Sequence, residues 1–258
     1  MFVKILACLM ALCFAYNAKA DDVEIVDSGE VGTDKACGDN CSWTLDDQGT
    51  LTISGIGQMY NYEATCETSP CSANYPWPSN VQKVVINEGI TSVGKYAFVY
   101  AHALTSVSLP STIQEIKTYA FHNTSALSKI NLPEGLKTIG KEAFSTSPID
   151  TLVVPSTIKS INPVAFYRHY DDEYAHINKI FCHKDMMDLC EAVFVKQNIT
   201  PIPYETAPNG KEFFYNGHFY SDPNDILKPD GYIKKRIYTI DEANTVTGPI
   251  NRISIKYR

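Results

Sequence analysis

The chain has 258 residues, of which 44% are apolar and 20% charged, a composition typical of a globular protein and not of a disordered or fibrous one. Its 22 Lys and Arg against 29 Asp and Glu give a net charge of −7, which argues against nucleic acid as a partner, because binding a phosphate backbone needs a concentrated basic surface. The length allows one or two domains of ordinary size.

Residues 1–20 have the features of a secretory signal peptide. Lys4 precedes an apolar run over residues 5–16, and Ala18-Lys19-Ala20 is the small-x-small pattern that a signal peptidase accepts. The apolar run is too short to cross a hydrocarbon core of about 30 Å. Removing the segment would leave 20 basic and 29 acidic residues, a net charge of −9.

A lipoprotein signal is a less favoured alternative for the same segment. The acylated residue would be Cys8 or Cys13, but Leu12 stands where a small residue is needed, and Cys8 lies close to the N-terminus. No later segment approaches the 18 or so consecutive apolar residues of a membrane-spanning helix, so we expect no membrane span.

Six further cysteines lie in three close pairs, and an even count in an exported chain indicates disulfides. Our hypothesis is that neighbours pair, although other connectivities are open. Zinc is disfavoured, because the spacings give no CxxC…CxxC arrangement. The predicted disulfide cysteines are Cys37, Cys41, Cys66, Cys71, Cys182 and Cys190.

Residues 21–80 are expected to form an N-terminal region with a β-hairpin. The hairpin would turn at residues 46–49 and bury Leu51 and Ile53. Trp43 and Trp77 are the only tryptophans of the chain. We interpret them as core residues in preference to ligand-stacking platforms.

Residues 81–200 contain a repeat. Ala-Phe dipeptides end at Phe98, Phe121, Phe144 and Phe166, spaced 23, 23 and 22 residues apart, and a degenerate copy ends at Phe194. A period in the low twenties predicts a solenoid of about five repeats, each 22–28 residues long. No single repeat can bury a core alone, so each must stack on its neighbours.

Within a repeat, each position has a predicted role. In residues 104–109, Val107 and Leu109 alternate with serines, which predicts a short strand with one buried face. Pro110 ends the strand, and Ile113 and Ile116 bring the chain back across the core at near-helical spacing. The phenylalanines are expected to stack into an internal spine.

These residues carry a family resemblance. The pattern L-x-x-V-x-L-P-x-x-I-x-x-I-x-x-x-A-F resembles the Treponema-type leucine-rich repeat of the BspA-like surface proteins, and residues 37–45, 49–55 and 76–77 resemble the lead-in that often precedes it. The resemblance covers about residues 37–200. It implies an exported or surface-displayed protein in a family associated with adhesion to host or matrix proteins, and it implies no catalytic residue.

The predicted fold class is therefore an α+β leucine-rich-repeat solenoid with an N-terminal β-hairpin cap and a small C-terminal α+β module. A cap is expected because an open solenoid end would expose apolar residues. In residues 201–258, the prolines at 201, 203 and 208 suggest a linker, and Asn216-Gly217 predicts a two-residue hairpin turn. Residues 239–242 fit a helix capping box with Gly248 as a stop, and residues 252–257 alternate like a strand.

A solenoid binds along the face formed by its strands, because outward residues of successive strands form rows. We name these rows the strand face and take it as the first candidate binding surface. For any one position the competing interpretation is an ordinary solvated strand residue. The strand face comprises Lys83, Val85, Ser106, Ser108, Lys129, Asn131, Thr151, Val153, Lys179 and Phe181.

An insertion of five residues after Phe166 is the second candidate, since solenoid insertions often lie on binding faces and tyrosine and arginine make recognition hot spots. A tolerated variable loop explains it equally well. A metal site formed by its histidines and acidic residues, His169, Asp171, Glu173 and His176, is a weaker alternative. The predicted binding residues of the insertion are Tyr167, Arg168, His169, Tyr170, Tyr174 and His176.

The sequence thus predicts a macromolecule-binding protein without a cofactor, whose partner is a protein of the host or matrix. An alternative is a cell-wall or glycan-binding protein acting through the aromatic residues of the C-terminal hairpin, residues 213–220. An enzyme is not expected, because the chain has no GxSxG, HExxH or phosphate-binding glycine loop.

Overall fold

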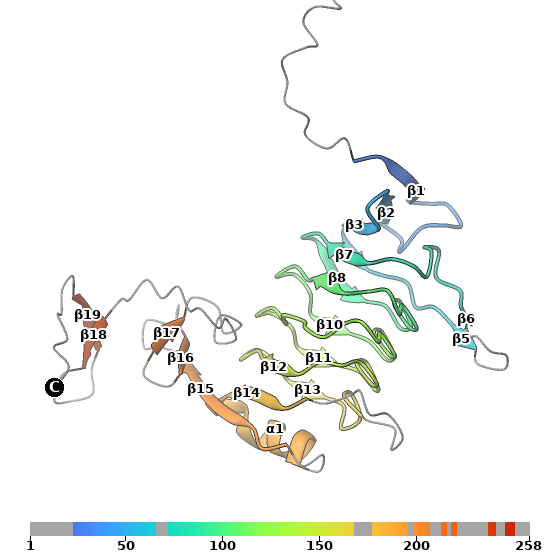
Figure 1. Cartoon of the computed structure of the whole chain (residues 1–258). Helices are drawn as coiled ribbons and strands as arrows, with labels where there is room; N and C mark the ends of the chain where they lie inside the picture. The colour runs from blue at the N-terminus through green and yellow to red at the C-terminus, as the bar shows by residue number, and fades with distance from the viewer. Residues whose placement is uncertain are drawn as a thin grey trace, which may run out of the picture.

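The computed structural model describes residues 23–65, 72–167, 177–195, 199–206, 213–215, 218–220, 237–240 and 246–250. Successive coils of chain stack on one another in sequence order, as Figure 1 shows from β3 down to α1. The described residues are mostly short strands, and they form a solenoid of stacked coils. The predicted signal peptide, residues 1–20, lies outside the described residues.

One side of the stack begins with a hairpin. β2 (Cys41–Asp46) and β3 (Thr50–Gly55) pair antiparallel, and β1 (Ile25–Gly29) adds to β2. β3 then pairs in parallel with β7 (Lys83–Ile86), which pairs with β9 (Ser106–Ser108). The hairpin therefore continues the same sheet as the repeats, with its predicted turn and with Leu51 and Ile53 fully buried.

This sheet is interrupted at the third repeat. Residues 127–133 form no strand, and a second parallel pair, β12 (Thr151–Val154) with β14 (Lys179–His183), begins in the fourth repeat. Leu127, Ile130 and Leu132 are nevertheless buried at the spacing of the other repeats. The apolar pattern thus keeps the third coil in place without a regular ladder.

The opposite side of the stack, which we name the return side, carries a second parallel sheet. Its strand order is β13-β11-β10-β8-β4, so neighbouring strands come from successive coils. The sequence suggested near-helical spacing here, but Ile90, Val93 and Ile116 are buried on strand segments, and Ile113 is buried just before β10. The strands are β4 (Gly57–Gln58), β8 (Ile90–Val93), β10 (Glu115–Ile116), β11 (Thr138–Ile139) and β13 (Ser160–Ile161). A short antiparallel pair, β5 (Ala64–Thr65) with β6 (Ser72–Ala73), lies outside both sheets.

A ladder of phenylalanine rings runs through the core, as predicted. Phe98, Phe121, Phe144 and Phe166 stack with ring centroids 5.2–5.3 Å apart. Trp77 stacks on Phe98 at 5.3 Å and has Trp43 against its edge at 6.1 Å. Both tryptophans are buried, which agrees with their predicted role as core residues.

The α component of the predicted fold is smaller than expected. In the part of the chain that the structure describes, the helices are η1 (Lys184–Met186) and α1 (Met187–Phe194), both in the degenerate fifth repeat. Phe194, the last residue of α1, meets Phe166 at 5.7 Å with its ring tilted by 47°. The helix therefore continues the phenylalanine ladder with altered geometry.

The C-terminal segment differs from its prediction in two places. The expected linker is wrong for β15 (Ile202–Thr206), which pairs in parallel with β14 and extends its sheet. The expected helix after residue 239 is also wrong, because β18 (Ile237–Ile240) and β19 (Val246–Ile250) pair antiparallel. Both strands are rich in β-branched residues, whose strand preference outweighs the capping-box signal. The strand predicted over residues 252–257 lies outside the described residues.

The predicted hairpin of residues 213–220 is confirmed at the level of its backbone. β16 (Phe213–Tyr215) and β17 (His218–Tyr220) pair antiparallel in the register that a two-residue loop requires. β16 also pairs with β15, so the hairpin joins the sheet of β12 and β14.

Two of the predicted disulfides are present, Cys37–Cys41 and Cys182–Cys190. The third predicted pair, Cys66 and Cys71, lies outside the described residues. Among the residues that the structure describes, no helix is long and apolar enough to cross a membrane.

Candidate functional site

Eight of the ten residues of the strand face lie on parallel strands, and Lys129 and Asn131 lie in the third repeat, where residues 127–133 form no strand. Lys83 lies opposite Ser106, Val85 opposite Ser108, and Thr151 opposite Lys179. Val85 and Thr151 are half-buried. Six of the ten predicted residues are exposed, namely Lys83, Ser106, Ser108, Lys129, Asn131 and Lys179.

Two predicted residues of the strand face are not available to a partner. Val153 and Phe181 are only 1% and 6% exposed, because they form a small cluster with Tyr204 and Ile202 of β15. Tyr204 crosses this end of the sheet, and its hydroxyl donates to the Val154 carbonyl at 2.8 Å. The prediction that Val153 and Phe181 face solvent is therefore wrong, and the chain's own β15 covers that end of the face.

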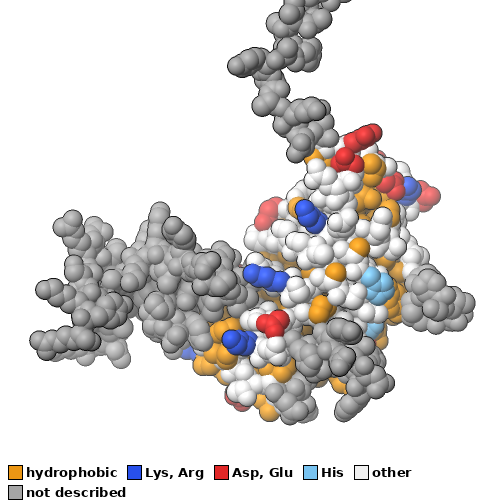
Figure 2. Space-filling model, viewed as in Figure 1, with side chains coloured by type: hydrophobic (Ala, Val, Ile, Leu, Met, Phe, Trp, Pro, Cys, Tyr) orange, Lys and Arg blue, Asp and Glu red, His pale blue; other side chains and the backbone are white. Residues whose placement is uncertain are grey.

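The part of the strand face on β7, on β9 and in the third repeat is exposed to solvent, and we name it the open part. Apart from Lys83 and Lys129, most of its side chains are short. β3 adds Thr50 and Thr52 in register with Lys83 and Val85, so hydroxyl groups extend the rows toward the hairpin. In Figure 2, lysine or arginine side chains recur one below another down the stack. The open part thus combines isolated positive charges with short hydrogen-bonding side chains on a net acidic protein.

An anionic group adjoins the lower end of this face. The Asp150 carboxylate accepts hydrogen bonds from the hydroxyl of Thr151 at 2.7 Å and from the side chain of Asn178. These bonds, with the nearby charge of Lys179, hold the pKa of Asp150 below its ordinary value. Lys179 therefore has the Asp150 carboxylate beside it, and the basic positions of the strand face without a neighbouring carboxylate are Lys83 and Lys129.

The insertion loop falls almost wholly outside the described residues. Tyr167, its first residue, is described and half-buried, and its backbone carbonyl accepts a hydrogen bond from the Ser145 hydroxyl at 2.8 Å. The remaining predicted residues, Arg168, His169, Tyr170, Tyr174 and His176, are not described. Elsewhere in the described chain, no group of three His, Cys, Asp or Glu side chains is placed to hold a metal ion.

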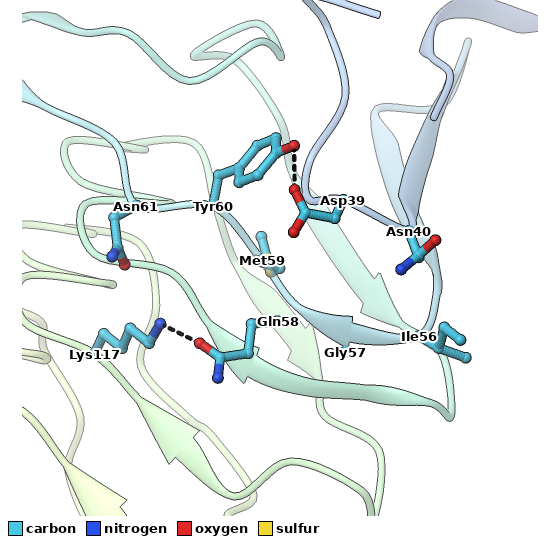
Figure 3. A pocket seen from close by; sticks show the side chains of 9 residues that line it. All are labelled: Asp39, Asn40, Ile56, Gly57, Gln58, Met59, Tyr60, Asn61 and Lys117. Atoms are coloured by element: carbon cyan, nitrogen blue, oxygen red, sulfur yellow. Dashed lines mark hydrogen bonds between the residues drawn. The ribbon is translucent and has the colours of Figure 1, made fainter. Parts of the chain in front are cut away.

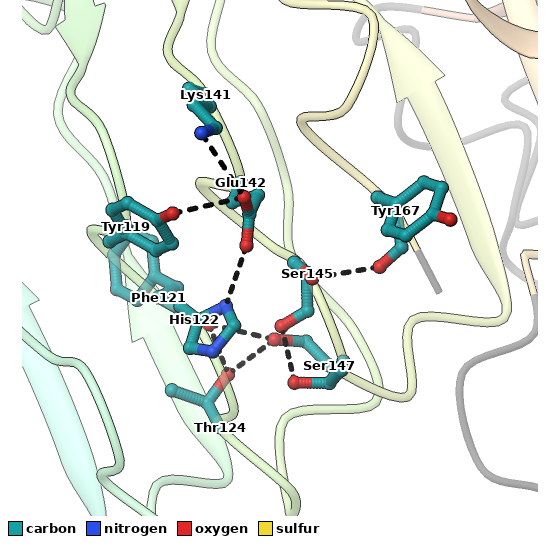
Figure 4. A network of polar contacts seen from close by, with 10 residues as sticks. Tyr119, Phe121, His122, Thr124, Lys141, Glu142, Ser145, Ser147 and Tyr167 are labelled. Atoms are coloured by element: carbon teal, nitrogen blue, oxygen red, sulfur yellow. Dashed lines mark hydrogen bonds and ion pairs between the residues drawn. The ribbon is translucent and has the colours of Figure 1, made fainter. Parts of the chain in front are cut away.

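A polar cluster at the edge of the stack was not predicted (Figure 4). The Tyr119 hydroxyl donates to Glu142 Oε1 at 2.9 Å, Lys141 Nζ lies 3.7 Å from the same oxygen, and His122 Nδ1 lies 3.8 Å from Oε2. Burial, with the Glu142 hydrogen bond as a second cause, raises the pKa of Tyr119 to about 12. The cluster links two successive coils through their edge side chains.

The edge cluster belongs to a second aromatic ladder. The Tyr96 ring stacks on Tyr119 with centroids 5.0 Å apart, and Lys95 Nζ lies 4.8 Å from the Tyr96 centroid. Tyr96, Tyr119 and Glu142 all have φ between 50° and 58°, a left-handed conformation that is uncommon outside glycine. The signal for this edge is the residue before each Ala-Phe dipeptide, which is aromatic in the first two repeats.

The comparisons with known proteins agree with the repeat architecture. Residues 78–173 match the family model of the BspA type leucine-rich repeat region in six copies. No curated protein matched the sequence.

Solved structures similar to the chain include leucine-rich repeat proteins and a vaccine antigen. A leucine-rich repeat protein from Eubacterium ventriosum is 21% identical, with 77% of this chain and 49% of that chain covered and a TM-score of 0.45. The T. pallidum protein TpLRR is 18% identical over 67% of this chain and 83% of its own, with a TM-score of 0.39. The pneumococcal vaccine antigen PcpA is 21% identical over 48% of this chain and 36% of its own, with a TM-score of 0.36.

The chain spans about half the length of the Eubacterium ventriosum protein.

Proposed function

We propose that this chain, which contains a BspA-type leucine-rich repeat region, is an exported, surface-displayed protein that binds other proteins through the open part of its strand face. Proteins with this type of repeat are generally interaction or surface proteins. The partner would be a host or matrix protein with an acidic surface, and binding would need no cofactor. The insertion loop is a second contact region in this proposal.

One observation supports the proposal above the others. Lys83 lies opposite Ser106 on paired strands, and Lys129 is exposed at the equivalent position of the next repeat, whose Leu127, Ile130 and Leu132 are buried in the core. A rigid, pre-formed row loses little conformational entropy when a partner binds. Because the chain as a whole is acidic, a partner with negative charge would be attracted to this row and repelled elsewhere.

A charge-reversal experiment tests the strand face. The triple variant Lys83→Glu, Lys129→Glu, Lys179→Glu would be compared with the wild-type protein for capture of matrix proteins from a solubilised extracellular matrix fraction. The matched control reverses three exposed lysines elsewhere, Lys141, Lys159 and Lys184. We expect capture to fall about tenfold or more in the strand-face variant only, because charge pairs govern encounter and specificity. Equal capture by both variants would exclude this face.

The export part of the proposal has its own test. A signal peptidase that cleaves after Ala20 leaves Asp21 as the new N-terminus. N-terminal sequencing of the protein recovered from the source cell's surface or medium should therefore begin Asp21-Asp22-Val23. A protein found only inside the cell, with Met1 intact, would contradict export.

The alternative through the C-terminal hairpin stays a prediction. The backbone of β16 and β17 forms the expected hairpin, but this gives no direct support for stacking on sugars, because the aromatic side chains lie outside the described features. Sedimentation of the strand-face variant with cell walls distinguishes binding through the hairpin from binding through the strand face. Retained cell-wall binding would favour the hairpin, and lost binding would favour the strand face.

A further inference from the structure

A hollow of about 400 Å³ lies where the N-terminal hairpin region meets the return side (Figure 3). Asp39 of the Cys37–Cys41 loop and Tyr60 stand on one side of it, and Gln58 and Lys117 stand on the other. The Tyr60 hydroxyl donates to Asp39 Oδ1 at 2.8 Å, so the ring is held at the rim, where the residue is 42% exposed. The hollow therefore has an aromatic wall and a polar border.

A second hollow of about 400 Å³ adjoins the first along the return side. The two share Gln58 of β4, and the second continues over β8 and β10 to Lys137 and Thr138. Because strands of the return side pair in register, their outward residues line this second hollow in steps of one coil. We name the two hollows together the return groove.

Two lysines fix the amide side chains of the return groove. Lys117 Nζ donates to Gln58 Oε1 at 2.8 Å, and Lys137 Nζ donates to Gln114 Oε1 at 2.7 Å. Each glutamine oxygen thereby accepts one hydrogen bond, and within the described part of the chain the amide N–H groups of Gln58 and Gln114 have no acceptor. The same arrangement in two places presents oriented N–H donors along the groove.

Ser92 supplies a separate indication of a ligand. It lies between Gln58 and Glu115 in the strand register and lines the second hollow, yet its residue is only 2% exposed. Its hydroxyl oxygen is buried and has no hydrogen-bond partner among the described residues. A buried polar group without a partner costs free energy, and a bound molecule with hydroxyl groups would satisfy it.

The charge of the return groove is balanced. Asp39 and Glu115 contribute carboxylates, and Lys117 and Lys137 contribute ammonium groups. An anion would meet the carboxylates and a cation the lysines, so neither is favoured. The exposed apolar lining is limited to Tyr60 and Ile56 among amides and hydroxyls, which does not suit a wholly apolar ligand.

We propose that the return groove binds a neutral oligosaccharide. Sugar hydroxyls both donate and accept, so they match the oriented amide N–H groups and the Ser92 hydroxyl, and the Tyr60 ring offers an apolar face for one sugar ring. The groove lies on the opposite sheet from the strand face. This site is therefore independent of the proposed protein-binding function.

The test uses the full-length chain and three neutral probes, cellotetraose, maltotetraose and chitotetraose. Binding is followed by saturation-transfer NMR and titration calorimetry at millimolar saccharide. The variants are Gln58→Ala and Ser92→Ala, with Gln82→Ala and Ser128→Ala as controls of the same residue types at exposed positions outside the groove. We expect at least one probe to bind, and each groove variant to weaken it about fivefold, the effect of one lost hydrogen bond.

Ser92→Ala separates binding from folding. Because it removes a buried hydroxyl without a partner, it should leave the midpoint of thermal unfolding unchanged or raise it while weakening the saccharide. No binding of any probe, or equal affinity in wild-type protein and both groove variants, would overturn the proposal. The strand-face triple variant should bind the saccharide normally, so failure of one proposal leaves the other standing.

Discussion

Two aromatic ladders run along the stack, two residues apart in each coil, in different surroundings. The phenylalanine pair Phe98 and Phe121 stacks at 5.2 Å, and the tyrosine pair Tyr96 and Tyr119 stacks at 5.0 Å, both with ring planes 12° apart. The phenylalanines are completely buried, whereas the tyrosines are partly exposed at the edge. The repeat period sets the geometry of both ladders, and burial decides how much each stabilises the fold.

The two ladders also differ in how far they extend. The phenylalanine ladder continues through Phe144 and Phe166 to Phe194. At the tyrosine position the third repeat has Glu142, which binds the Tyr119 hydroxyl in place of stacking on its ring. An interior position tolerates only an apolar ring of the same shape, while the edge position exchanges ring stacking for a hydrogen bond.

The largest expected loss of stability follows from a substitution in the phenylalanine ladder. Phe121→Ala should lower the free energy of unfolding by about 3–5 kcal/mol, because it removes a fully buried ring between two others and leaves a cavity. Tyr119→Ala should cost only about 1 kcal/mol. Urea unfolding followed by circular dichroism measures both. Equal losses would mean that the two ladders contribute alike, against the difference in burial.

The next largest loss of stability is expected from removing a buried hydroxyl beside the phenylalanine ladder. Ser147 Oγ donates to the Phe121 carbonyl at 2.8 Å, and Thr124 Oγ1 lies 2.8 Å from Ser147 Oγ (Figure 4). Ser147→Ala leaves a buried carbonyl with one partner fewer, so the free energy of unfolding should fall by about 1–2 kcal/mol. Ser128→Ala, at an exposed position whose hydroxyl has no hydrogen bond within the described chain, should change it by less than about 0.5 kcal/mol. An unchanged free energy of unfolding in Ser147→Ala would show that this hydroxyl does not stabilise the core.

The sequence predicts the inner ladder well and the strand face only in part. The Ala-Phe period identifies Phe98, Phe121, Phe144 and Phe166, because interior positions depend on contacts one coil away. Burial of Val153 and Phe181 depends on Tyr204, whose hydroxyl reaches a carbonyl 50 residues earlier in the chain. No local pattern predicts that contact, and an alternating strand is read as half-exposed without it.

One recurring sequence pattern, at the turns between strands, makes contacts that the sequence alone does not predict. Glu-Gly and Ser-Thr alternate at the turn of successive coils, and the structure pairs them: Ser111 N–H and hydroxyl donate to Glu88, and the Gly135 N–H donates to the Thr157 hydroxyl. The Ser111 N–H holds the pKa of Glu88 below its ordinary value. The return groove was missed for the same reason, because Gln58 and Lys117 meet only when the coils are stacked.

A smaller loss of stability is expected when the Tyr119 hydroxyl of the tyrosine ladder is removed. Tyr119→Phe keeps the ring stack with Tyr96 but removes the hydrogen bond to Glu142, so the free energy of unfolding should fall by about 0.5–1 kcal/mol. Tyr96→Phe is the matched control, since its hydroxyl has no hydrogen bond within the described chain, and it should be neutral. If the control costs as much as Tyr119→Phe, the edge hydrogen bond contributes nothing of its own.

The smallest expected effect is a loss of stability at alkaline pH that involves the tyrosine ladder alone, because phenylalanine does not titrate. Burial raises the pKa of Tyr119 from its ordinary value of 10.0 to about 12, so the folded chain keeps the proton that the unfolded chain loses. The unfolded state then binds fewer protons between pH 10 and 12, and stability falls as pH rises through that window. Tyr62, Tyr75 and Tyr100, whose pKa values burial also raises, add to this fall. Tyr119→Phe should therefore lose less stability than the wild-type protein when urea unfolding is repeated at pH 9 and pH 11. Parallel losses in the two proteins would place the Tyr119 hydroxyl in a solvated edge, with no share in the alkaline sensitivity of the fold.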